Sequence, residues 1–73
     1  MILISYITPY IIVHSDRLIS GNMTIKNKKN QTIWGNQFTN KEYINIKVKP
    51  SWPKNLMVSV MVDGNKITKT ITL

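Results

Sequence analysis

Apolar and polar residues alternate along much of the chain, and this period of two predicts β-strands. Between Tyr43 and Lys49, the apolar residues Ile44, Ile46 and Val48 face one side and polar residues face the other. A second alternating stretch, residues 56–62, carries the apolar stripe Leu56, Val58, Val60 and Val62. We therefore expect two strands, each with one face turned toward a shared core.

Turn signals separate these two stretches from further strand-like runs. The pair Thr8-Pro9 ends the first apolar run, Asn27–Asn30 forms a hairpin loop, and Asp63–Asn65 is a strong hairpin signal because Asp and Gly tolerate positive φ. We also expect a turn at residues 15–17, a break at residues 35–36 and a stiff corner at residues 50–53. The prediction is about seven short strands, at residues 2–7, 10–14, 23–26, 32–34, 43–49, 56–62 and 66–73.

The composition favours an all-β class in a single domain, residues 1–73. The β-branched residues Ile, Thr and Val are frequent, whereas alanine is absent and the helix formers Leu and Glu are scarce. A domain of this size buries only about 60% of the surface that its unfolded chain exposes. Because the chain has no cysteine, no disulfide reinforces the thin core. Stability must come from packing or from a partner that buries more surface.

The order of strands and turns from Gly21 to Leu73 resembles that of small Ig-like domains of secreted and surface proteins, especially C-terminal modules in Bacteroidetes. The matching pieces are Met23–Lys26, Asn27–Asn30, Thr32–Gly35, Tyr43–Ile46, Pro53, Val58–Val60 and Asp63–Lys66. One departure is Asn55, where those domains usually have glycine. The resemblance implies a small Ig-like β-sandwich of mostly antiparallel strands, and it supplies no catalytic residues.

The charge balance bears on the kind of partner. Ten Lys and Arg residues against three Asp and Glu residues give a formal net charge of +7, which favours acidic partners. A candidate basic patch consists of Lys26, Lys28, Lys29, Tyr43, Lys47 and Lys49. A basic face with an aromatic residue is how small β-barrels bind single-stranded nucleic acid. Lysines also keep edge strands from pairing with other chains, and we favour this interpretation because only Tyr43 is clearly placed for stacking.

Three large side chains are candidates for a protein interface. Trp52 stands between Pro50 and Pro53, so it either caps a corner of the fold or anchors a partner, as tryptophan does in interface hot spots. Met57 and Met61 point away from the apolar stripe of their strand. On the surface they would mark an apolar patch that meets another protein, whereas a central strand would bury both of its faces.

We expect no catalytic, cofactor-binding or metal-binding residues, and no small-molecule substrate. The adjacent residues His14, Ser15 and Asp16 alternate between the two faces of a strand, so they do not converge as a Ser-His-Asp site requires. One histidine and no cysteine are too few for a zinc site.

The sequence predicts a non-catalytic structural or protein-interaction module of a larger assembly, with a virion or cell-surface setting favoured. Its partner is another protein or copies of itself. The alternative is a small basic β-barrel that binds single-stranded nucleic acid. No segment is long enough to span a membrane, and the apolar start lacks the basic residues and cleavage site of a signal peptide. Within the fold, we expect the hairpin Leu56–Leu73 to be the stability core, with Lys69 at a sheet edge.

Overall fold

The computed structural model describes residues 1–73 and is all-β, as predicted. Its strands are β1 (Ile2–Ile7), β2 (Tyr10–Lys26), β3 (Thr32–Lys47), β4 (Asn55–Val62) and β5 (Asn65–Thr72). All pairings are antiparallel. The predicted number of seven strands is wrong, because five strands form one hydrogen-bonded sheet. The chain offers no helical segment with the length and hydropathy that crossing a membrane requires.

Two of the predicted boundaries fall inside long strands, which explains the difference in number. Residues 10–14 and 23–26 are the two ends of β2, and residues 32–34 and 43–47 are the two ends of β3. The turn expected at 15–17 is wrong, because Ser15 pairs with Ile2 and is buried. The break expected at 35–36 is also wrong, because Gly35 pairs with Thr24. In both places a neighbouring strand supplies backbone partners that local sequence does not reveal.

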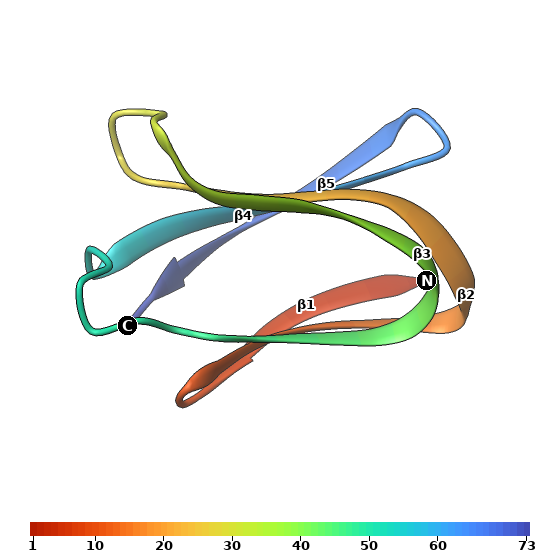
Figure 1. Cartoon of the computed structure of the whole chain (residues 1–73), viewed down its shortest axis with the longest axis horizontal. Coiled ribbons are helices and arrows are strands. Elements are labelled where there is room, and N and C mark those ends of the chain that lie inside the picture. The colour runs from red at the N-terminus through yellow and green to blue at the C-terminus, as the bar shows by residue number, and fades with distance from the viewer.

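The long strands β2 and β3 bend together, and the bend folds the sheet over itself (Figure 1). Register shifts between His14 and Ile19 and between Ile19 and Gly21 mark the bend in their pairing. In β3 the bend is at Asn40, which has a φ of 50° and donates its N–H to Ser20 Oγ at 3.0 Å. Such irregularities bend the strand that carries them. They divide β3 into a first arm, residues 32–38, and a second arm, residues 41–47.

The hydrophobic core lies between the two halves of the folded sheet. It consists of Ile4, Ile11, Val13, Ile19, Met23, Ile25, Leu56, Val58, Val60, Val62 and Ile71, all buried. The predicted apolar stripe of residues 56–62 is therefore confirmed, and β4 is a central strand between β2 and β5. The expected position of Lys69 is also confirmed, because it is exposed on β5, an edge strand.

The predicted turns form as side-chain chemistry dictates. Asp63 and Gly64 have φ values of 52° and 76°, the two positive values of a type I′ hairpin. In the loop after β2, the Asn27 side-chain oxygen accepts hydrogen bonds from the N–H groups of Lys29 and Gln31 at 3.0 and 2.9 Å. These local bonds hold the loop without help from the rest of the protein.

The sheet has edges at β1, β5 and β3, and β3 is the longest of these three strands. The strand β3 runs along one side of β2, whereas β1 and β4 share the other side of β2. On that other side β1 and β5 contact each other. No strand pairs with the outer edge of β3. The folded sheet is therefore open along β3 (Figure 1).

Candidate functional site

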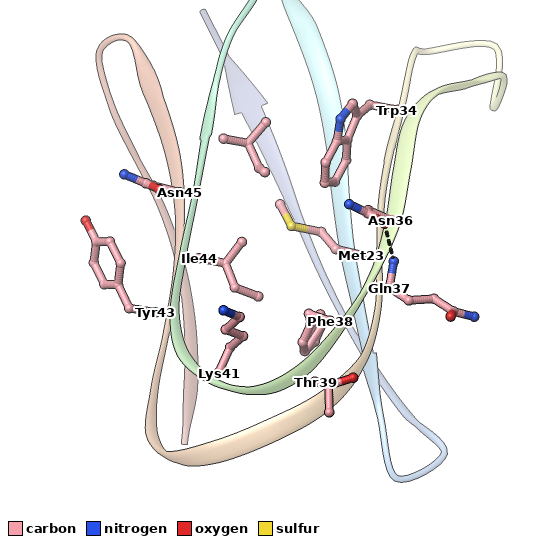
Figure 2. Close-up of a pocket in the computed structure, with 11 residues that line it drawn as sticks. Met23, Trp34, Asn36, Gln37, Phe38, Thr39, Lys41, Tyr43, Ile44 and Asn45 are labelled. Atoms are coloured by element: carbon pink, nitrogen blue, oxygen red, sulfur yellow. Dashed lines mark hydrogen bonds between the residues drawn. The ribbon is translucent and has the colours of Figure 1, made fainter.

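A groove of about 700 Å³ lies between the two arms of β3. Figure 2 shows Trp34 and Phe38 of the first arm and Ile44 of the second arm pointing into it, with Met23 of β2 at its base. Ile46 also lines this β3 groove. No residue of β3 is fully buried. The apolar β3 side chains of the groove are therefore half-buried, whereas Met23 beneath them is buried.

Polar residues also line the β3 groove: Asn36, Gln37, Thr39, Lys41 and Asn45. The Asn36 Oδ1 accepts a hydrogen bond from the Gln37 N–H at 2.9 Å, and the Lys41 side chain is exposed. No carboxylate lines the groove. Its chemistry suits a ligand that carries both apolar and polar groups, with a negative group near Lys41.

A second surface is the outward face of the three strands that form the β1 half of the sheet. The register aligns three rows of residues across β1, β2 and β3, and opposed residues share a face. The rows of this β1–β2–β3 outer face are Leu3, His14 and Tyr43; Ser5, Ile12 and Asn45; and Ile7, Tyr10 and Lys47. The intervening rows, which include Ile4, Val13 and Ile11, point into the core.

This outer face is apolar although it is exposed. The exposed fractions are 55% for Leu3, 64% for Ile7, 54% for Tyr43 and 39% for Tyr10. An antiparallel sheet with one face on the core normally presents polar side chains on the other face. Here the face contains no acidic residue and gathers most of the exposed large hydrophobic side chains of the protein. Contiguous apolar patches of this kind mark interaction sites.

Three of the residues on the outer face carry rings. The His14 and Tyr43 rings meet edge to face, with centroids 6.3 Å apart and an interplanar angle of 63°. Tyr10 lies opposite Lys47 in the last row. Rings near a cation can contact either a protein or a nucleobase.

The residues of the predicted basic patch lie in separate places. Tyr43 and Lys47 are on the outer face of the β1 half, and Lys49 follows the end of β3. Lys26 pairs with Met57 on the other half of the sheet. The loop residues Lys28 and Lys29 are exposed and share a small hollow with Lys54, a lysine that the sequence interpretation did not include.

The predicted interface residues do not form one surface. Trp52 is half-buried and packs against the hydrophobic core. Met57 is half-buried, and Met61 is 39% exposed beside Asn22 and Lys66. Between the two methionines lies Ser59, whose hydroxyl is 3.1 Å from that of Thr68. The outward face of β4 is therefore mixed rather than apolar.

Two of the three acidic residues are already paired. The N-terminal ammonium of Met1 donates to Asp16 Oδ1 at 2.8 Å and holds the pKa of this carboxyl below its ordinary value. Asp63 lies 3.7 Å from the Arg17 guanidinium. Glu42 has no salt bridge, and neither has any lysine. None of the lysine charges is thus neutralised by a salt bridge within the protein.

The adjacent residues His14, Ser15 and Asp16 have separate environments. The buried Ser15 hydroxyl accepts a hydrogen bond from the Arg17 N–H at 3.2 Å, while His14 is exposed beside Tyr43. No group of three His, Asp or Glu side chains gathers in a way that could hold a metal ion.

Sequence interpretation missed Leu3, Ile7 and Tyr10 of the outer face. A signal was present: the two-residue turn Thr8-Pro9 fixes the register, so Ile7 opposes Tyr10 and the odd residues of β1 share a face with the even residues of β2. Comparison with known proteins adds no family. No protein-family model matches the chain, and no curated protein matches it significantly.

Proposed function

We propose that the protein is a non-catalytic interaction module that binds another protein, within a larger assembly, through the β1–β2–β3 outer face. The observation that carries this proposal is the exposure of Leu3, Ile7, Tyr10 and Tyr43 on one face of the sheet. Tyrosine and large apolar residues are the residue types that fill the centres of protein interfaces, and charged residues are depleted there.

The small size of the domain supports the same proposal. Thirteen of 73 residues are buried, so burial in the core contributes only a small free energy of folding. A partner that covers the outer face would add apolar burial at about 25 cal/mol per Å² and would stabilise the fold by mass action. The Ig-like description and a virion or cell-surface setting belong to this proposal. They are supported by the order of turns from Gly21 to Leu73 and by the two packed halves of the folded sheet.

A charge placed on the outer face tests the proposal. We expect Ile7→Lys to reduce capture of the partner from the native source by about tenfold or more, because hot-spot contacts are worth over about 1.4 kcal/mol each. The matched control is Thr70→Lys, which adds the same charge to an exposed position on β5. Captured proteins are compared by quantitative mass spectrometry, and both variants must keep the thermal midpoint of the wild type. Equal capture by the wild-type protein, Ile7→Lys and Thr70→Lys would contradict docking through this face.

Binding of single-stranded nucleic acid is a second candidate, favoured by a specific observation. Tyr10, His14 and Tyr43 share the outer face with Lys47, and sheets of this kind stack bases on two or three rings. We rank it second because Leu3 and Ile7, the two most exposed large hydrophobic side chains of the face, are aliphatic.

Salt dependence separates the two candidates. With a fluorescent single-stranded oligonucleotide, we expect no saturable binding at low salt if the outer face serves a protein. Binding that weakens steeply with salt through counterion release, and that Tyr43→Ala weakens by about 1–3 kcal/mol, would instead establish the nucleic-acid function. The readout is fluorescence anisotropy at two salt concentrations.

A further inference from the structure

We infer that the free edge of β3 accepts an extended segment of an acidic partner protein, which adds to the sheet as a sixth strand and covers the β3 groove. The segment would carry apolar and acidic residues at alternate positions and would pair antiparallel with residues 43–47. The edge shares Tyr43, Asn45 and Lys47 with the proposed docking face, but strand addition uses their backbone groups and the groove on the core side. The inference therefore does not depend on the proposed function.

The first argument is the backbone of the second arm. The Val48 N–H donates to the Pro9 carbonyl oxygen at 2.8 Å, in the same register that pairs Ile46 with Ile11 and Ile44 with Val13. In an antiparallel ladder, hydrogen-bonded and non-hydrogen-bonded pairs alternate. Ile44 and Ile46 therefore bond to β2.

The residues between them have the opposite orientation. The N–H and C=O groups of Tyr43, Asn45 and Lys47 point to the free edge of β3, where no strand pairs with them. A row of such groups is the template to which an extended peptide adds by β-augmentation.

The second argument is the groove beside this edge. An added strand places every second side chain on the core side, over Trp34, Phe38 and Ile44, which stay half-buried without it. Apolar side chains at those positions would close the open side of the core. The bend at Asn40 confines regular pairing to the second arm, so the segment needs only about five to seven residues at about 3.4 Å each.

The third argument is charge, and it selects the partner. Lys47 lies on the outward face of the second arm and Lys49 follows that arm, whereas Lys41 lines the groove. Glu42 is the one acid among them. None of these lysines has a salt bridge within the protein. A second copy of this chain would bring +7 against +7 and like charges to the same edge, which opposes pairing. The outward side chains of the added strand are therefore acidic.

The geometry fixes which residues of the segment bond to β3. Directly opposed residues share a face, so the residues opposite Tyr43, Asn45 and Lys47 are the outward, acidic ones, and their N–H groups bond to β3. The apolar residues direct their N–H groups away from β3. Blocking the N–H groups of the acidic residues should weaken strand pairing, whereas blocking those of the apolar residues should not. Adsorption without strand pairing would not distinguish the two.

The experiment uses a fluorescent heptapeptide in which Glu and Val alternate, with Glu at both ends and both termini blocked. Anisotropy titrations compare it with a version N-methylated at the inner Glu residues, a version N-methylated at the Val residues, and a version with Lys in place of Glu. We expect methylation of Glu to weaken binding by about tenfold or more, because each lost hydrogen bond leaves a buried carbonyl unpaired. Methylation of Val should leave the affinity unchanged, and the Lys peptide should not bind.

Variants of the protein give the reciprocal test. Asn45→Pro removes an N–H that faces the free edge, at a kind of position where edge strands tolerate proline, and we expect it to weaken binding of the Glu/Val peptide about tenfold. The matched control is Thr70→Pro. The Leu73 N–H donates to the Lys54 carbonyl oxygen, so Leu73 and Ile71 bond to β4 while Thr72 and Thr70 do not. The Thr70 N–H therefore faces the outer edge of β5, away from the β3 site. The Thr70→Pro variant should bind the peptide like the wild type. If Asn45→Pro fails to fold, the two methylated peptides decide the matter on the wild-type protein.

Each remaining outcome has a definite meaning. Equal binding of both methylated peptides, or unchanged binding by a folded Asn45→Pro variant, would overturn strand addition. Equal binding of the Lys peptide would overturn the acidic partner. Ile7→Lys should bind the Glu/Val peptide like the wild type, and a loss there would move the site to the outer face. Failure of partner capture through the outer face leaves these peptide results unaffected.

Discussion

Gly21→Ala should lower the free energy of unfolding by about 3 kcal/mol, the upper end for overpacking in a close-packed site. A Cβ atom at Gly21 would overlap the carbonyl oxygen of Met61 and would lie 3.3 Å from Cγ2 of Val62. Backbone cannot give way as a flexible side chain does, so β2 and β4 must separate where their pairing begins. Urea unfolding followed by circular dichroism measures the change.

Gly35→Ala is the matched control for this prediction. A Cβ atom at Gly35 meets Thr24 Cγ2 at 3.5 Å, an ordinary contact. Restricting the unfolded chain should then stabilise the protein by about 0.4–1 kcal/mol. If both alanine variants unfold at the midpoint of the wild type, the close approach of β2 and β4 at Gly21 is not present in solution.

The sequence alone predicted the parts of the fold that local chemistry determines. Strand β1 begins and ends at the predicted residues, and the turns at 27–30 and 63–64 form where Asn, Asp and Gly adopt positive φ. The alternation in residues 56–62 identified the buried face of β4, because Leu56, Val58, Val60 and Val62 are all buried. Each of these features depends on a few neighbouring residues.

The bends of β2 and β3 depend on distant residues, and for that reason they were missed. Nothing near Ser15 in the sequence indicates that Ile2 will pair with it, and Gly35 continues a strand because Thr24 lies opposite. The actual bend in β3 is at Asn40, which is held by the Ser20 hydroxyl twenty positions away. Polar residues at 39–42 were the only local sign of it.

The candidate surfaces were harder to predict than the strands. In β1 the residues on both faces are mostly apolar, so alternation could not show that Ile4 is buried and Ile7 exposed. The charged residues were easy to find but not to group, because Lys26 and Lys47 lie on different halves of a sheet whose folding the sequence did not reveal. The free edge of β3 follows from strand order, which no local pattern encodes.

Val60→Ala is expected to lower the free energy of unfolding by about 2–3 kcal/mol, from about 0.8 kcal/mol for each buried carbon removed and a further cost for the cavity left behind. Val60 has no exposed surface and lies between Met23 of β2 and Ile67 of β5. A domain of this length has a total stability of about 4–11 kcal/mol, so the loss is a large part of the whole.

The neighbouring side chain supplies the control, because Met61 is 39% exposed on the opposite face of β4. Met61→Ala should cost about 0.5 kcal/mol or less, as surface changes do. Both variants are compared by urea unfolding, with equal m-values as the sign that the two-state analysis holds. If Val60→Ala keeps the wild-type midpoint while Met61→Ala loses stability, the two faces of β4 are exchanged. In that case the face of Thr68, Thr70 and Thr72 would be the one turned inward, and the hairpin Leu56–Leu73 would not be the stability core.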